Sequence, residues 1–156
     1  MLSKEADTIL KNLSKVEAGI AKIYSYLSEK EAFTGEARQF WAGLAKEELV
    51  HARVFSDIRE WAASAAACRV EIEFDPQMLE LFVERVNRLL RDVVRQQATE
   101  KEAYLFCLFI ENELDEAHFA RKIQVNDDTL SRKLEKVEKD TKRHGRIIAE
   151  RAQGVS

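Results

Sequence analysis

Hydrophobic residues recur at intervals of three and four positions along most of this chain, which is the spacing of one face of an α-helix. This pattern predicts four long helices, over residues 3–30, 36–66, 99–123 and 129–152. Asp75-Pro76 predicts a further helix over residues 76–95, since Asp is a favoured N-cap and Pro is favoured at the first helical position. We expect residues 69–74 to be irregular or briefly extended, and residues 126–128 to form a turn.

The order of these predicted helices indicates how they pack. Two helical hairpins, over residues 3–66 and 99–153, are separated by a crossover over residues 67–98 that contains the extra helix. Two hairpins joined by a long crossover are one way to build an antiparallel four-helix bundle. We therefore expect an all-α protein with a single domain over residues 1–156.

Glutamate and histidine interrupt the apolar faces of the four long helices. Glu17, Glu48, His51, Glu111 and His144 each stand where the helical spacing favours a hydrophobic residue. Burying an unpaired carboxylate among helices is costly, so buried charges are normally paired or bound to metal. The simplest explanation for glutamate and histidine meeting in one core is a metal site.

The two hairpins place these polar residues at matching positions. An offset of 94 residues relates Glu17 to Glu111, and an offset of 93 relates His51 to His144. Residue identity between the hairpins is low, but the polar interruptions coincide. Each hairpin is therefore expected to supply one half of a common site.

A Glu from each of two helices, with Glu-x-x-His from each of the other two, is the ligand set of a carboxylate-bridged dinuclear metal site. Residues three apart project from the same helix face, so Glu48 and His51 can share one ion. Carboxylates with imidazoles suit iron, and zinc and manganese are alternatives. We expect one or two ions per chain, held by Glu17, Glu48, His51, Glu111 and His144.

This arrangement resembles the ferritin-like superfamily, and within it the rubrerythrin-type single-domain proteins. The resemblance covers nearly the whole chain and is carried by Glu17 with Tyr24, Glu48-x-x-His51, Glu111 with His118, and His144. It implies an iron centre that reacts with oxygen or peroxide, or a role in handling iron. The chain has no Cys-x-x-Cys pair, so no rubredoxin-like iron centre is expected.

The chain departs from the family pattern at Thr141, which stands where a second bridging Glu is expected. Without that carboxylate, a second ion at Glu111 and His144 would bind more weakly than the first. Asp140 is a candidate substitute ligand, although it lies about 100° from the apolar face of its helix.

Tyr24 and His118 are candidates for residues that support the ligands. Tyr24 would donate a hydrogen bond to a ligand, and His118 would do the same or bind metal itself. A single His on an apolar helix face is, however, more often an ordinary core residue. No catalytic residue is assigned from the sequence.

A competing interpretation is a non-catalytic ferritin-like scaffold with a degenerate or single-metal site, which acts by dimerisation or partner binding. In that case Glu48 and His51 form a buried pair that satisfies itself. The third long helix is apolar nearly all round, so the crossover helix or a second subunit must cover it. This apolar surface, which favours a homodimer, consists of Phe106, Leu108, Phe109 and Ile110.

Charge and cysteine content narrow the remaining possibilities. The net charge of −3 gives no indication of binding to nucleic acid or to an anionic membrane. The sequence shows no signal peptide and no apolar run long enough to span a bilayer. Cys68 and Cys107 form no disulfide framework, so we expect a cytoplasmic protein.

Overall fold

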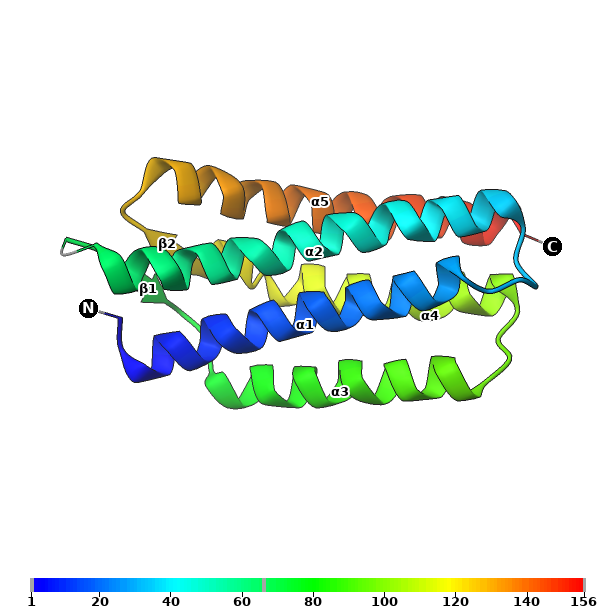
Figure 1. Ribbon diagram of the computed structural model, residues 1–156, viewed down its shortest axis with the longest axis horizontal. Helices are drawn as coiled ribbons and strands as arrows, with labels where there is room; N and C mark the ends of the chain where they lie inside the picture. The colour runs from blue at the N-terminus through cyan, green and yellow to red at the C-terminus, as the bar shows by residue number, and fades with distance from the viewer. Residues whose placement is uncertain (1, 66, 156) are drawn as a thin grey trace.

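The protein is helical along almost its whole length. The computed structural model describes residues 2–65 and 67–155, and their α-helices are α1 (Lys4–Ser28), α2 (Gly35–Ser64), α3 (Pro76–Arg95), α4 (Glu100–Ala117) and α5 (Asp128–Gly154). All five run along the long axis of the molecule, and each reverses the direction of the one before it (Figure 1). The prediction of an all-α protein is confirmed.

Each helix begins at a side chain that caps its first turn. The predicted cap at Asp75 is confirmed, because its carboxylate accepts a hydrogen bond from the backbone N–H of Gln77. Thr99 and Glu102 form a reciprocal capping box at the start of α4. Ser3, Thr34 and Asp127 cap the other three helices in the same way.

Two short strands connect segments that are distant in the sequence. β1 (Val70–Ile72) pairs in antiparallel fashion with β2 (Ile123–Val125), and Glu71 lies opposite Gln124. The brief extension expected in residues 69–74 is thus confirmed. The expectation that a helix continues to residue 123 is wrong, because α4 ends at Ala117 and is followed by a short 3₁₀ turn, η1 (Ala120–Lys122).

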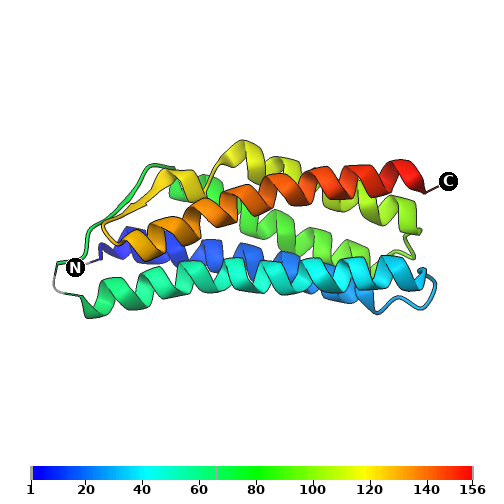
Figure 2. The ribbon, with the colours of Figure 1, turned by 90° about the horizontal axis from the view of Figure 1, so that it is seen from above.

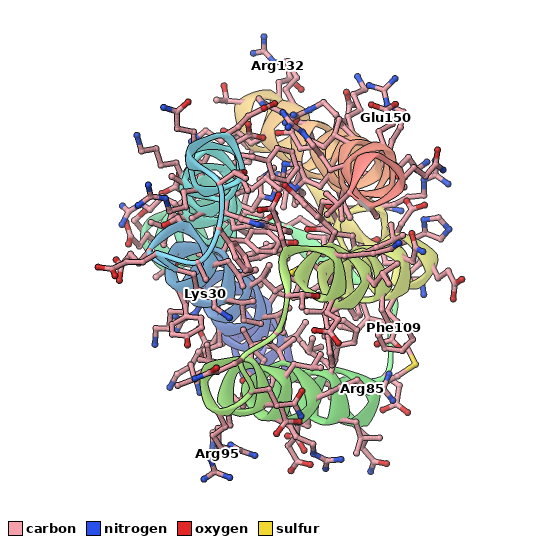
Figure 3. The ribbon with its side chains drawn as sticks, turned by 90° about the vertical axis from the view of Figure 1, so that its right-hand side faces the viewer. Lys30, Arg85, Arg95, Phe109, Arg132 and Glu150 are labelled. Carbon is pink, nitrogen blue, oxygen red and sulfur yellow. The ribbon has the colours of Figure 1, made fainter. Side chains whose placement is uncertain are left out.

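Four of the helices surround a common interior, and α3 lies outside them. α1 packs against α2, α4 packs against α5, α2 contacts α5, and α3 covers α1. An end-on view shows α1, α2, α4 and α5 around the interior, with α3 beneath α1 and α4 (Figure 3). The first and last described residues lie at opposite ends of the molecule (Figure 2).

The apolar surface of α4 is only partly covered. Ile110 is buried and Phe106 and Leu108 are half-buried, but Phe109 remains 54% exposed. Leu105, one turn before Phe109, is exposed to a similar extent.

Within the ranges that the structure describes, no helix combines the length and apolar character needed to cross a membrane.

An aromatic cluster fills the interior next to the polar residues. The Trp41 ring lies between Tyr24 and Tyr104, with ring centroids 5.1 Å and 5.0 Å away. All three side chains are buried, and they come from α1, α2 and α4. These rings fix three helices relative to one another at one end of the polar interior.

Candidate metal centre

The five predicted ligands are all buried in the interior that the four helices surround. None is more than 5% exposed, although each carries a group that is normally solvated. α1 supplies Glu17, α2 supplies Glu48 and His51, α4 supplies Glu111, and α5 supplies His144. Such burial requires compensation by a charged partner or an ion.

Glu48 is the centre of this group because it contacts both imidazoles. Its Oε2 lies 3.0 Å from Nδ1 of His51, and its Oε1 lies 2.6 Å from Nδ1 of His144. The three residues offer ligand atoms that all lie within 4.8 Å of one another. His51 and His144 stack with ring centroids 5.5 Å apart, so both rings present Nδ1 to the same carboxylate.

The outer nitrogen of each imidazole contacts a carboxylate on the opposite helix. Nε2 of His51, on α2, lies 3.2 Å from Oδ2 of Asp140 on α5. Nε2 of His144, on α5, lies 2.8 Å from Oε2 of Glu47 on α2. A carboxylate on the outer nitrogen fixes the tautomer and orientation of an imidazole, and this is the usual environment of histidine that binds metal.

Glu47 was missed in the sequence analysis, although a signal for it exists. The offset of 93 residues that relates His51 to His144 also relates Glu47 to Asp140. The two outer carboxylates are therefore equivalent positions of the two hairpins. The spacing of apolar residues does not indicate Glu47, because its side chain, which is 39% exposed, lies beside the apolar face of its helix.

Neither Asp140 nor Thr141 replaces the absent bridging carboxylate in this structure. Asp140 binds the outer side of His51 and is also paired with Lys136 and Arg143. The Thr141 hydroxyl donates to the Val137 carbonyl oxygen of its own helix, 3.0 Å away. Asp140 therefore lies on the outer side of His51, the position from which a carboxylate can orient an imidazole.

Glu111 completes the centre on the side of α4. Its Oε1 accepts a hydrogen bond from the Tyr24 hydroxyl and lies 3.7 Å from Nδ1 of His144. Burial and the nearby Glu48 carboxylate raise the pKa of Glu111 to about 8, although His144 and Tyr24 act in the opposite direction. The Tyr24 hydroxyl thus donates a hydrogen bond to one of the candidate ligands.

Burial and neighbouring charges also shift the pKa values of Glu48, His144 and Glu17. Burial opposes ionisation of Glu48, but its contacts with His144 and His51 outweigh that effect and lower its pKa to about 2. Burial disfavours the charged form of His144, but Glu48, Glu111 and Glu47 raise its pKa to about 9. Burial, with the nearby Glu48 and Glu111 carboxylates, holds the pKa of Glu17 well above its usual value.

Four buried atoms of the five candidate ligands have no hydrogen-bond partner: Oε2 of Glu17, Oε1 of Glu48, Oε2 of Glu111 and Nδ1 of His144. The contact of 2.6 Å between Glu48 and His144 therefore lacks hydrogen-bond geometry. An ion shared by Glu48 and His144 would give both atoms a partner. The donor set of two imidazoles and up to three carboxylates fits iron, zinc or manganese.

His118 and the two cysteines lie outside this group. The expectation that His118 lies on a helical face is wrong, because it follows the last residue of α4 with a φ of 49° and its side chain is 39% exposed. Cys68 and Cys107 are free thiols, and burial raises the pKa of Cys107 well above its usual value.

Comparison of the chain with protein-family models, with curated proteins and with solved structures finds no match in any of the three. The function of the chain is therefore inferred from its own residues and their contacts.

Proposed function

We propose that this chain is a rubrerythrin-like, iron-binding protein of ferritin-like type, which reacts with oxygen or peroxide. The ion would be held by Glu48, His51 and His144, with Glu111 and Glu17 as adjacent carboxylates. The observation that carries this proposal is the contact of 2.6 Å between Oε1 of Glu48 and Nδ1 of His144, two buried atoms without hydrogen-bond partners. An ion between them would satisfy both.

Each residue of the proposed centre has a part that follows from its contacts. Glu47 and Asp140 hold the imidazoles with Nδ1 facing inward. The Tyr24 hydroxyl holds a proton at Oε1 of Glu111, beside the proposed ion. The aromatic cluster excludes water from one end of the centre. When bound, iron would supply the electrons for reduction of oxygen or peroxide.

The absence of a carboxylate at Thr141 favours one tightly held ion at this centre. Glu48 contacts both imidazoles, whereas the equivalent position on α5 has only a hydroxyl, which is bonded to its own helix. A second ion at Glu111 and His144 would lack the carboxylate that bridges it to the first. We therefore expect one ion bound by Glu48, His51 and His144.

The competing function is a metal-free helical scaffold that acts as a homodimer. Two observations favour it. The contacts of Glu48 with two imidazoles already balance charge in the interior, and Leu105 and Phe109 form an uncovered apolar surface on α4. A measurement of the metal bound per chain distinguishes the two proposed functions.

Elemental analysis after anaerobic loading with ferrous iron and desalting tests the proposal. We expect at least one iron per chain, and its loss in His144→Ala when circular dichroism shows that the variant remains helical. Peroxide or oxygen consumption by the loaded protein then tests the reaction. A folded wild-type protein that retains no iron, zinc or manganese would overturn the proposal and leave the scaffold function.

A further inference from the structure

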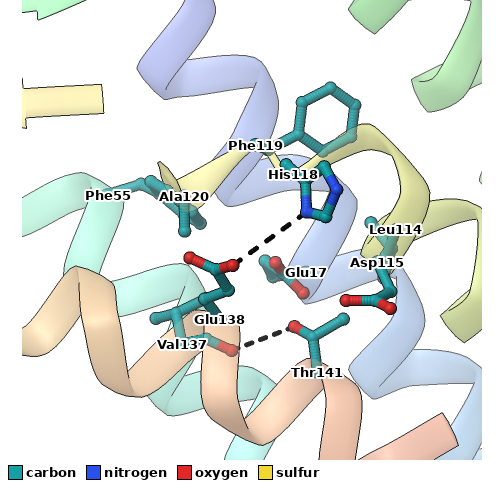
Figure 4. A pocket seen from close by; sticks show the side chains of 10 residues that line it. All are labelled: Glu17, Phe55, Leu114, Asp115, His118, Phe119, Ala120, Val137, Glu138 and Thr141. Carbon is teal, nitrogen blue, oxygen red and sulfur yellow. Dashed lines mark hydrogen bonds and ion pairs between the residues drawn. The ribbon is translucent and has the colours of Figure 1, made fainter. Parts of the chain in front are cut away.

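Two spaces in the structure reach candidate ligands, and they differ in size. The first is a cavity of about 20 Å³ beside Glu17, between α1, the end of α4 and α5 (Figure 4). The second is a groove of about 310 Å³ between α2 and α5, and it reaches His51. A divalent ion with about six bound waters occupies roughly 200 Å³, at about 30 Å³ per water. The groove therefore admits a hydrated ion, whereas the cavity does not.

The groove leads from the surface of the protein to a buried carboxylate. Leu49 and Val50 of α2 line it, and they are 57% and 59% exposed. His51 and Asp140 also line it, but they are only 2% and 8% exposed, so they form its inner end. A carboxylate is a ligand that divalent cations favour. A cation that enters the groove therefore meets Asp140 beside a candidate ligand.

One imidazole ring separates the inner end of the groove from Glu48. Nε2 of His51 lies 3.2 Å from Oδ2 of Asp140, and Nδ1 of the same ring lies 3.0 Å from Oε2 of Glu48. The five candidate ligands are at most 5% exposed, so an ion can reach them only if a side chain moves. A rotation of His51 would connect the groove to Glu48.

A cationic side chain occupies the carboxylate at the end of the groove. Nζ of Lys136 donates to Oδ2 of Asp140, the same oxygen that contacts His51. The side chain of Lys136 is 69% exposed, and ion pairs of such exposed groups are weak. Arg143 lies 3.3 Å from the other oxygen, Oδ1, but it also bonds to Glu47 and is only 37% exposed. Lys136 is therefore the more readily displaced of the two cations.

We propose that the groove between α2 and α5 is the entry site for a divalent cation, with Asp140 as the first carboxylate to bind it and Lys136 as the residue that closes the site. The inference rests on the proposed function, because the ion must finally bind at Glu48, His51 and His144. The arriving ion displaces the Lys136 ammonium from Asp140, and His51 then turns to admit the ion. Asp140 binds it only in transit, so the number of ions per chain stays the same.

Stopped-flow mixing of the metal-free protein with Co²⁺, followed by the visible absorption of the bound ion, tests the role of Lys136. Lys136→Met should bind Co²⁺ about 3- to 10-fold faster, because the Asp140 carboxylate is then free to receive it. Lys133→Met is the matched control, since Lys133 lines the same groove but pairs with Asp57. Loss of the Lys133 charge should change the rate by less than about twofold at physiological ionic strength.

A second pair of variants tests the route itself. Val50→Trp places a large side chain in the groove, so it should slow the binding of Co²⁺ severalfold. Leu105→Trp is its control, because it adds the same side chain at an exposed position of α4, and it should bind Co²⁺ at the wild-type rate. Both variants should bind as much Co²⁺ as the wild type at equilibrium.

The outcomes separate this inference from the proposed function. Equal rates in the two lysine variants, or a wild-type rate in Val50→Trp, would overturn the entry site and leave the metal centre. A folded wild-type protein that binds neither Co²⁺ nor iron would overturn both proposals.

Discussion

Glu48 contacts both imidazoles, whereas Glu47 contacts only the outer nitrogen of one. Glu48→Gln should therefore weaken Co²⁺ binding by more than about 100-fold, since it removes a proposed ligand. Glu47→Gln should weaken it by about 10- to 100-fold, which is typical for loss of a carboxylate that orients a histidine ligand. Competition titration with a chromophoric chelator measures both affinities, and equal losses in the two variants would contradict the arrangement.

Metal affinity should rise with pH. In the metal-free protein the pKa of Glu111 is raised to about 8 and that of His144 to about 9, so both groups hold protons at neutral pH. A metal ion must displace these protons, and the competition disappears as the pH rises through each pKa. Affinity should therefore increase between about pH 7 and pH 9 and level off above. Calorimetry in buffers of different ionisation enthalpy measures the protons released, and no release at neutral pH would contradict the prediction.

The sequence predicts the inner residues of the centre but not the outer carboxylates, of which Glu47 is an example. Helical spacing identified the residues of the apolar faces, and the structure buries all five of those proposed as ligands. The outer carboxylates could not be identified in that way, because Glu47 and Asp140 do not stand at the apolar positions of their helices. Asp140 was considered only as a ligand, since the sequence does not show which side of His51 it contacts.

The packing of α3 against α1 depends on Gly19. A Cβ at Gly19 would lie 2.9 Å from Cγ1 of Val86, whose branched side chain has little freedom in a helix, whereas Gly43 is exposed with nothing within 4 Å. Gly43→Ala should stabilise the protein by about 1 kcal/mol through helix propensity. Gly19→Ala should instead destabilise it by about 1–2 kcal/mol, because overpacking outweighs that gain. Urea denaturation compares the two, and equal effects would show that α3 does not pack as described.

The end of α4 was the helix boundary that the sequence did not indicate. Residues 117–123 contain no Gly or Pro, so nothing local predicted a stop. The helix ends because His118 adopts a left-handed conformation and residues 123–125 pair with β1, some fifty residues earlier. Such pairing is a tertiary effect. The other helices carried local signals, such as Asp75-Pro76 and the capping box at Thr99, and those boundaries were predicted within a few residues.

The candidate centre joins the two halves of the protein, since Glu48 and His51 come from the first hairpin and His144 comes from the second. An ion that binds only the folded state should therefore stabilise the entire fold. At an ion concentration of about 100 times Kd the gain is about 2.7 kcal/mol, which corresponds to roughly 5–10 °C in Tm for a domain of this size. Differential scanning calorimetry with and without chelator measures the shift, and Glu48→Gln should show none.

The aromatic cluster gives the protein an optical property that depends on the same centre. Trp41 packs against Tyr24, whose hydroxyl donates to Glu111, and it lies two helical turns, about 10 Å, from Glu48 along α2. Trp61 lies about 20 Å from Glu48 along the same helix. A paramagnetic ion at the centre should therefore quench the emission of Trp41 far more than that of Trp61. Trp61→Phe should keep the quenching and Trp41→Phe should lose it, so the intrinsic fluorescence of the unlabelled protein would report the arrival of the ion in real time.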